Sequence, residues 1–379
     1  MDGGNISWYL SQKQVIKHGR MKISLVANIQ RPGEQYRCIL YPLATIKEIA
    51  RLIEDSGHTV QLVNASWPTL KLLLKLKIFR PDLIINLAEG LSSSETRLSF
   101  FPELYEYLKI PFIGSSANCQ YMSLNKDMAK YLVSKSGIKV PKGYLVRQVG
   151  DIELALRFFE KEDYPLFIKP NFEGDSDGIH KDSVIRDQKQ LESRGKKLLL
   201  EFPQGILVEE FIEGKDIEVG YIEGLGEDGV IEPTFVNIKS NRQGEGKFTY
   251  AMYEHKNYAS EENYLPGSYL PRSIIGDEKL RTEVIKQAKK CFDLLGVSYF
   301  SRLDFRLGKN NSLFFLENNP ACSLKHDSVL FHVTEKYYGM NYSQVLDYLV
   351  KLCCRKNGLR YQNGWKLTDQ LPRKMAEAV

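Results

Sequence analysis

The sequence predicts an α/β protein that combines an N-terminal parallel sheet with two further β-rich domains. Between residues 21 and 115, strand-like runs alternate with helix-like runs, which is typical of a parallel sheet covered by helices. Beyond residue 140, strand-like runs outnumber helical ones. The length of 379 residues also exceeds the roughly 250–300 residues at which a single hydrophobic core stops growing, so we expect two or three domains.

The N-terminal domain begins at Met21, where an apolar run follows a polar segment that shows no sustained period. Strands and helices then alternate at residues 22–28, 42–55, 59–63, 68–78, 83–88 and 98–108. A further helix begins within residues 123–126 and ends at Gly137, with Pro141 shortly beyond it, as expected past a helix end.

The rest of the chain contains the β-rich regions. Strands are predicted at residues 143–147, 165–169, 206–211, 217–222, 230–238, 299–307 and 312–317, with helices near 151–162, 278–295 and 342–354. A polar turn at 308–311 joins the last two strands. We therefore divide the chain into an extension (1–20), an N-terminal domain (21–118), a central domain (119–212), a C-terminal domain (213–355) and a polar tail (356–379).

Composition narrows the class of protein. A hydrophobic fraction of 43% and a charged fraction of 26% exclude a disordered chain, a collagen and a small disulfide scaffold. The formal net charge of +5 suits an anionic small molecule without requiring nucleic acid. No apolar run approaches the roughly 18 residues of a membrane span, and the six cysteines form no C-x-x-C pair. We expect a reduced, cytoplasmic protein with neither a membrane nor a nucleic-acid partner.

Several short sequences resemble known ligand-binding motifs, but the residues around them exclude that interpretation. Residues 224–229 fit G-x-G-x-x-G, but strand-like residues follow where a dinucleotide site needs a helix, so a hairpin turn is predicted. Lys247 lacks the following Ser or Thr of a phosphate-binding P-loop. His326 and His332 are six residues apart and fit no zinc signature.

A lysine followed by a glycine-containing loop indicates a phosphate site. Lys169 lies near the end of the apolar strand at 165–169, and Gly174 and Gly178 follow in the loop. Glycines allow backbone N–H groups to approach phosphate oxygens, and the lysine adds a fixed positive charge. The alternative is a surface lysine beside an ordinary loop, which the apolar strand makes less favoured.

Two later segments carry acidic side chains. An apolar strand runs into the acidic linker 209–216, where carboxylates and backbone groups can bind an adenine and a ribose, although most such linkers are only solvated. Arg302 and Asp304 share one strand face, as do Glu317 and Asn319. If the turn at 308–311 pairs the two strands, these side chains converge into an oxygen-rich site suited to Mg²⁺, with an arginine for a phosphoryl group.

A polar, glycine-containing stretch at 241–268 shows no clear periodicity. Long loops of this kind often close over active sites, so we predict a lid around residues 253–258. A disordered insertion is the alternative.

Taken in order, these motifs resemble the ATP-grasp superfamily and, within it, the D-alanine–D-alanine ligase branch. The resemblance extends from about Met21 to about Lys351. The motifs that carry it are residues 86–90, 110–115, 123–126, the Lys169 loop, 209–216, 253–256, 302–304 and 317–328. It implies an ATP-grasp fold, in which a parallel βαβ domain precedes two β-rich domains that grip ATP.

The resemblance also implies residue roles. The ATP-binding residues would be Lys126, Lys169, Gly174, Asp175, Glu209, Glu210, Ile212 and Asp216, with adenine at Glu209 and the backbone of 210–212, and ribose at Asp216. The ligands of two Mg²⁺ ions, or of Mn²⁺, would be Asp304, Glu317 and Asn319. The catalytic residues would be Arg302, Lys256 and Ser176, and the substrate contacts Glu34, Glu95, Ser323 and Ser328.

Some positions depart from the pattern of this branch. Ser323 stands where the family has a glycine whose N–H serves the oxyanion, and Asp175 replaces a small serine in the phosphate loop. Asn257 replaces the lid tyrosine, and the residues around Glu34 differ from those near the family's first acidic residue. The substrate-facing positions therefore differ more than the nucleotide-binding ones.

The predicted function is ATP-dependent joining of a carboxylate and an amine through an acyl phosphate. The departures favour amino-acid or peptide substrates outside cell-wall synthesis. The alternatives are a D-alanine–D-alanine ligase of peptidoglycan synthesis, and a ligase that loads an amino acid onto a carrier protein or peptide. A non-catalytic ATP-binding module is remote, because it should lack a metal ligand or a phosphate lysine. The resemblance also implies a homodimer.

Overall fold

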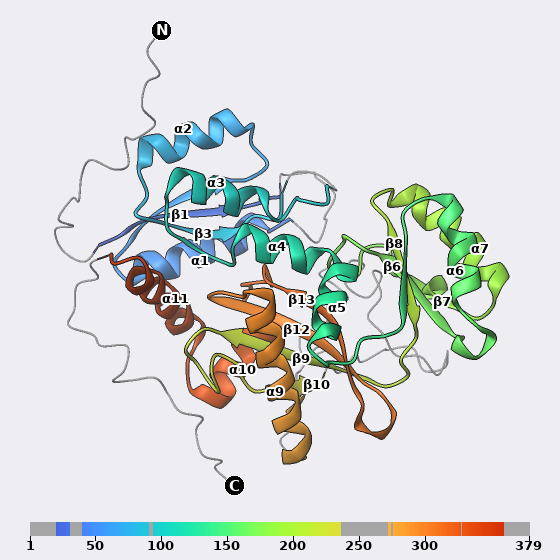
Figure 1. The fold of residues 1–379 in the computed structure, drawn as a ribbon. Coiled ribbons are helices and arrows are strands. Elements are labelled where there is room, and N and C mark those ends of the chain that lie inside the picture. The colour runs from blue at the N-terminus through green and yellow to red at the C-terminus, as the bar shows by residue number, and fades with distance from the viewer. Residues whose placement is uncertain are drawn as a thin grey trace.

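The computed structural model describes residues 20–30, 40–90, 94–235, 272–273, 276–326 and 328–359. These residues form three sheets with helices packed on them, and the chain passes through the sheets largely in sequence order (Figure 1). The mixed α/β class predicted from the sequence is confirmed.

The first sheet is parallel and lies in the N-terminal part of the chain. Its strand order is β2-β1-β3-β4, from β1 (Lys22–Ala27), β2 (Thr59–Asn64), β3 (Leu83–Leu87) and β4 (Phe112–Ile113). Its helices are α1 (Leu43–Asp55), α2 (Thr69–Phe79) and α3 (Phe100–Leu108). Leu25 packs in one core cluster with α1, whereas Val26 packs in another with α2 and α3, so alternate residues cover opposite faces.

The second sheet is antiparallel, in the order β5-β8-β6-β7. Its strands are β5 (Gly143–Val146), β6 (Leu166–Pro170), β7 (Val184–Ile185) and β8 (Ile206–Glu210), and α6 (Val149–Phe158) and α7 (Gln188–Glu201) share its core. The helix expected at 151–162 ends earlier, because the chain turns at Phe159 into the short 3₁₀ helix Lys161–Asp163. Helix α7 was not predicted, since Gly195 and many charged residues hide its apolar stripe.

The third sheet is antiparallel, in the order β11-β10-β9-β12-β13. Its strands are β9 (Lys215–Ile222), β10 (Thr234–Phe235), β11 (Arg272–Ser273), β12 (Phe300–Leu307) and β13 (Leu313–Asn319). Helices α5 (Lys126–Lys135) and α9 (Glu278–Leu295) cover one face, where Val219 and Leu303 are fully buried. The alternate residues Glu218, Arg302 and Asp304 therefore belong to the other face.

Two details of this sheet bear on the sequence prediction, one against it and one in its favour. Among the described residues, the strand expected at 230–238 is limited to Thr234–Phe235. Val230 forms isolated bridges with Tyr221 and Glu227, and residues 231–233 belong to no strand. The turn at 224–229 has positive φ at all three of its glycines, Gly224, Gly226 and Gly229, which agrees with the predicted hairpin turn and not with a dinucleotide loop.

The remaining helices join the sheets. They are α4 (Ala117–Leu124), α10 (Val329–Tyr338) and α11 (Tyr342–Lys356). Helix α11 packs against α1 below the first sheet, so that Val345 and Ile49 belong to one hydrophobic cluster (Figure 1). At the end of α4, Ser123 accepts a hydrogen bond from Asn318 of β13 at 2.8 Å, which fixes the start of α5 against the third sheet.

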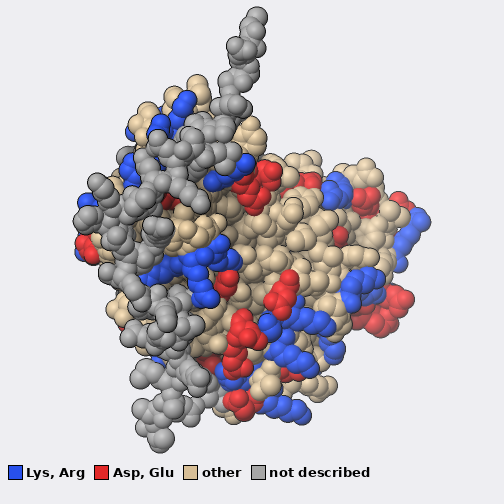
Figure 2. Space-filling model, turned by 60° about the vertical axis from the view of Figure 1, so that its left-hand side comes forward, with Lys and Arg blue, Asp and Glu red and all other residues tan. Residues whose placement is uncertain are grey.

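The surface and the helices add two general observations. On the face shown in Figure 2, basic and acidic side chains are interspersed among uncharged residues. Across the described residues, no helix has the length and apolar character that crossing a bilayer requires.

Candidate active site

A cavity lies between the second and third sheets and encloses about 1070 Å³, including its open mouth. One wall comes from β6, β8 and the loop after β6, and the other from β9, β12 and β13, while the first residue of α5 reaches in between. The lining includes basic, acidic and apolar side chains, among them Lys126, Phe167, Lys169, Phe211, Asp304 and Glu317. This combination suits a ligand with a flat apolar part and a charged part.

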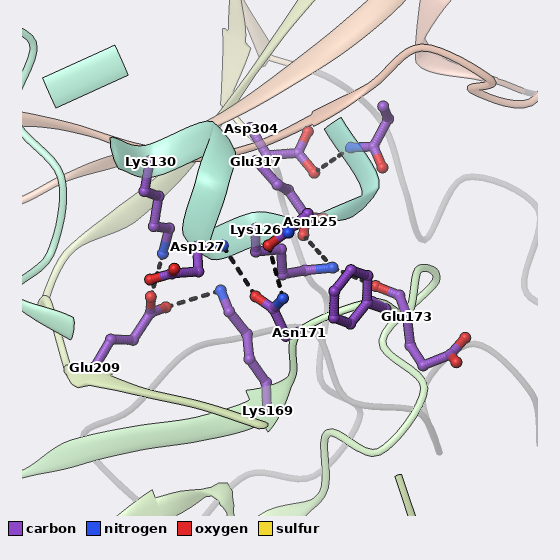
Figure 3. Close-up of polar contacts among 12 residues, drawn as sticks. Asn125, Lys126, Asp127, Lys130, Lys169, Asn171, Glu173, Glu209, Asp304 and Glu317 are labelled. Carbon is purple, nitrogen blue, oxygen red and sulfur yellow. Dashed lines mark hydrogen bonds and ion pairs between the residues drawn. The ribbon is translucent and has the colours of Figure 1, made fainter. Parts of the chain in front are cut away.

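Two asparagines hold the start of α5 against β6. Asn125 is the N-cap of α5 and accepts from the N–H of Met128 at 3.2 Å. Asn171, which follows β6, donates to Asn125 Oδ1 at 2.8 Å and accepts from the N–H of Asp127 at 2.9 Å (Figure 3). The two side chains fix Lys126 at the helix start relative to Lys169 at the strand end.

Three lysines are buried where α5 meets β6. Lys126, Lys130 and Lys169 are each between 5% and 6% exposed. Lys130 and Lys169 both form ion pairs with Glu209, whereas Lys126 pairs with Glu317 at 3.3 Å. The result is a cluster of buried cations with fewer buried anions, which is suited to a polyanion such as a triphosphate.

Burial shifts the pKa values of this cluster. Burial lowers the pKa of Lys126 and lowers that of Lys130 to about 8, although nearby carboxylates oppose the change. Glu209 is buried as well, but Lys130 and Lys169 outweigh that burial and hold the pKa of its carboxyl below the ordinary value. Glu209 is therefore ionised at neutral pH.

The hairpin of β12 and β13 brings four predicted residues together. Asp304 lies opposite Glu317, and Arg302 lies opposite Asn319. Arg302 donates to both oxygens of Asp304, at 2.7 and 2.8 Å, and Asn319 donates to the same carboxylate at 3.1 Å. The predicted convergence is therefore present in the structure.

The hairpin provides a cluster of oxygen donors. Burial raises the pKa of Asp304 to about 6, Arg302 opposes this shift, and Glu218 and Glu317 add to it. Among the described residues, no three His, Cys, Asp or Glu side chains converge closely enough to hold a metal by themselves. The Asn319 amide oxygen would have to complete the set, and such an oxygen-only set fits Mg²⁺.

An arginine that was not predicted joins the start of the third sheet to the 209–212 linker. Arg306 donates to the carbonyl of Ile212 at 2.9 Å and to Asp216 at 2.6 Å. It follows Asp304 by two residues on the same strand face, so the alternation along β12 could have identified it. Asp216, Glu210 and Ile212 line the cavity as expected.

The loop after β6 is held in an unusual backbone conformation. Asp175 and Ser176 both have positive φ, at 50° and 66°, and both line the cavity. At Gly178 a Cβ would lie 2.5 Å from a ring carbon of Pro170, so only glycine fits this close approach. The loop therefore packs closely on β6 at Gly178 and presents residues 174–177 to the cavity.

A largely buried network of two carboxylates and an arginine adjoins this loop. Arg97 is 3.6 Å from Glu89 and 3.2 Å from Glu173, which also lines the cavity. Burial raises the pKa of Glu89 to about 7, the charge of Asp175 adds to the shift, and Arg97 opposes it. Near neutral pH the network therefore exchanges a proton.

The raised pKa of Glu89 predicts a pH-dependent stability. An ordinary glutamate titrates near 4.5, so between pH 4.5 and about 7 the folded chain binds more protons than the unfolded chain. The free energy of unfolding should then fall as pH rises through this window, by about 1–3 kcal/mol. Glu89→Gln should remove this contribution, as chemical denaturation at pH 5 and pH 8 would reveal. Parallel pH profiles for the wild type and the variant, with the exposed Glu153→Gln as control, would contradict the assignment.

The structure brings most of the predicted residues into one cavity. The lining contains Lys126, Lys169, Gly174, Asp175, Ser176, Glu209, Glu210, Ile212, Asp216, Arg302, Asp304 and Glu317, and Asn319 contacts Asp304. The residues predicted to contact the substrate do not line this cavity where the structure describes them. Glu95 forms an ion pair with Arg147 at 3.2 Å, and Glu95, Ser323 and Ser328 lie outside the lining of this cavity. Lys256 and Glu34 lie outside the described residues.

Sequence reasoning missed several residues of the site. Lys130 follows Lys126 by four residues and so lies on the same helix face, which is a readable signal. Glu218 follows Asp216 by two residues on β9 and shares its face. Arg97 had no such signal, because it reaches Glu173 across 76 residues of sequence.

The comparisons with known proteins agree with this geometry. A family model described as D-ala D-ala ligase C-terminus matches residues 132–351. The chain is 26% identical to the D-alanine–D-alanine ligase of Aquifex aeolicus, covering 81% of this chain and 94% of that one. It is 25% identical to the uncharacterized protein y4sG of Sinorhizobium fredii, covering 89% and 98%. A crystal structure of the Bacillus anthracis D-alanine–D-alanine ligase complexed with ATP superposes with a TM-score of 0.66 at 18% identity, covering 89% and 99%.

The fold and the site define an ATP-grasp ligase, an enzyme that forms carbon–nitrogen bonds. The family model spans more than half of the chain, so the chain belongs to the D-alanine–D-alanine ligase family. It is accordingly an ATP-dependent carboxylate–amine ligase, and the family to which it belongs acts on small-molecule amino-acid substrates.

Proposed function

We propose that this chain condenses two D-amino acids into a dipeptide, with D-alanine as the first substrate to test. The observation that carries the proposal is the cavity that has buried lysines on one side and the Asp304–Glu317 hairpin on the other. The relative from Aquifex aeolicus, named a D-alanine–D-alanine ligase, aligns with this chain over 94% of its own length. This similarity favours the dipeptide over the predicted substrates outside cell-wall synthesis.

In this proposal the two walls of the cavity bind different parts of the ATP–Mg²⁺ complex. The central domain, 119–212, supplies Lys126 and Lys169 for the ATP phosphates, and the loop at Gly174–Ser176 covers them. The C-terminal domain, 213–355, supplies Asp216 for the ribose. The adenine would lie against the 209–212 linker, near the tilted aromatic rings of Phe167 and Phe211, whose centroids are 6.0 Å apart. Asp304, Glu317 and Asn319 would hold two Mg²⁺ ions, which supply Lewis-acid stabilisation of phosphoryl charge when bound.

The reaction proceeds in two steps that conserve atoms and charge. A carboxylate oxygen of the first amino acid attacks the γ-phosphorus, the bond to the β-phosphate oxygen breaks, and ADP leaves with an acyl phosphate formed. The amine of the second amino acid then attacks the acyl carbon, loses a proton, and displaces inorganic phosphate. Arg302 would stabilise the oxyanion of the tetrahedral intermediate, and the lysines offset the charge on the transferred phosphoryl group.

A second candidate function keeps the chemistry and changes the substrates. Asp175, on a backbone of positive φ, presents a carboxylate to the cavity where the family has a small serine. A carboxylate there suits a substrate that carries an additional amine, as a basic amino acid or a peptide would. Loading of a carrier-bound amino acid is a further form of this candidate. Lys256 as a lid cation, Glu34 as a substrate contact, a homodimer and a cytoplasmic location also remain predictions.

The test is ADP and phosphate release from ATP and Mg²⁺, with product masses. The substrates are D-alanine alone, other D-amino acids, L-amino acids, and pairs that include a basic residue or a dipeptide. We expect ADP, phosphate and D-alanyl-D-alanine in equal amounts with D-alanine. Turnover only with another acid–amine pair would overturn the D-alanine proposal and support the second candidate.

A further inference from the structure

Lys130 is a buried cation without a role in the proposed reaction. Only 5% of the residue is exposed, and it does not line the cavity, whereas its neighbours Lys169 and Glu209 do. An ammonium group is costly to bury unless its charge is compensated. Its position therefore calls for an explanation through the groups that it contacts.

The contact that explains it is with Glu209, which lies between two lysines (Figure 3). Oε1 of Glu209 is 2.8 Å from Nζ of Lys169, and Oε2 pairs with Lys130. Each carboxylate oxygen therefore has its own lysine. Lys130 comes from α5, Lys169 from β6 and Glu209 from β8, so three elements meet at this carboxylate.

The charges of this triad favour a polyanion in the cavity. Two lysines and one glutamate leave one positive charge in excess, while the adjacent Lys126–Glu317 pair is neutral in sum. If Glu209 had Lys169 as its only partner, the two would form a closed neutral pair. Sharing the carboxylate with Lys130 weakens the hold of Glu209 on Lys169.

We propose that Lys130 is a positioning residue that keeps the Lys169 ammonium available to the nucleotide phosphates by taking one oxygen of Glu209. The inference rests on the proposed function, because it assumes that Lys169 binds phosphate. It also gives Glu209 a different task from adenine binding, namely to orient Lys169 along the end of β6. The hydrogen bonds of Asn171 with Asn125 and with the N–H of Asp127 hold α5 at the distance that this sharing requires.

The experiment measures binding to the whole chain in the presence of Mg²⁺, without any amino acid. ATP affinity is measured directly, and inorganic tripolyphosphate, which has no base, is measured by competition. The variants are Lys130→Met, Lys130→Arg, Glu209→Gln and the double variant Lys130→Met/Glu209→Gln. The control is Lys135→Met, an exposed lysine of the same helix. Thermal unfolding of every variant reports whether it is folded.

We expect Lys130→Met to weaken ATP and tripolyphosphate by the same factor, about 10-fold or more, and Lys130→Arg to restore most of the loss. Because Lys130 acts through Glu209, adding Lys130→Met to Glu209→Gln should change ATP affinity by less than about threefold. A loss confined to ATP would show that the triad serves the base, and an equal loss in both backgrounds would show that Lys130 acts independently of Glu209. Either result overturns the proposal, as does an unfolding temperature lowered without any change in affinity.

This experiment separates the inference from the proposed function. Nucleotide binding does not depend on which acid and amine are joined, so a wrong D-alanine assignment leaves the binding results unaffected. One further variant, Lys169→Met, tests the assumption about Lys169. If it does not weaken tripolyphosphate binding, the phosphate role of Lys169 fails, and the inference about Lys130 fails with it.

Discussion

Replacing Asp304 by asparagine should lower kcat by about 10³-fold while the chain stays folded. Asp304 accepts both bonds of Arg302 and a third from Asn319, and it lies opposite Glu317. The substitution keeps the shape of the side chain but removes the charge that a divalent cation and the arginine both require. The measurement is ADP release at a series of Mg²⁺ concentrations, and the concentration for half-maximal activity should rise.

The control for this variant is Asp293→Asn, an exposed aspartate on α9. It should leave both kcat and the Mg²⁺ requirement unchanged. Glu317→Gln should behave like Asp304→Asn, because the two carboxylates face each other across the hairpin. Wild-type turnover in either site variant would refute the metal assignment of this hairpin.

Changing Arg302 to lysine should lower kcat by about 10²- to 10³-fold with little change in the KM for ATP. Arg302 makes a two-bond contact with Asp304 and lies 3.5 Å from Glu218, and its side chain lines the cavity. Lysine keeps the positive charge but cannot reproduce the planar, two-bond geometry. Steady-state kinetics with ATP varied at saturating amino acid would separate kcat from KM.

The conservative change is chosen because alanine would leave Asp304 and Glu218 buried without their counter-ion. Arg157→Lys, at an exposed position on α6, is the matched control. A variant whose KM for ATP rises while kcat holds would mean that Arg302 binds nucleotide and takes no part in the chemical step.

Local patterns were sufficient to predict much of the fold. Helix α9 occupies the predicted residues 278–295, because an amphipathic stripe ends at Gly296, which has the left-handed conformation of a helix stop. The short helices α4 and α10 were missed. Helix α4 extends over eight residues, and its apolar positions give almost no amphipathic signal. Such helices form because tertiary contacts stabilise them, and propensity alone does not predict them.

The site was predictable where its residues are close in sequence. Strand alternation was enough to place Arg302 with Asp304, and a polar turn was enough to pair them with Glu317. The lysine cluster depends instead on how α5 lies across β6 and β8, so Lys130 and Glu209 meet across 79 residues. No local sequence pattern predicts a contact between residues so far apart, so the sharing of Glu209 by two lysines became apparent only in the structure.

The asparagine pair at the start of α5 determines which parts of the enzyme can move. Helix α5 packs Ala129 and Val133 into the core of the third sheet, while Asn125 is bonded to Asn171 beyond the second sheet. Separating the two walls at this end would break those bonds together with the buried ion pairs. Lys126 and Lys169, the two lysines proposed to bind phosphate, are therefore expected to move as one rigid unit. Nucleotide should then bind to lysines that are already in place, and any opening of the cavity should occur at the end away from the two asparagines.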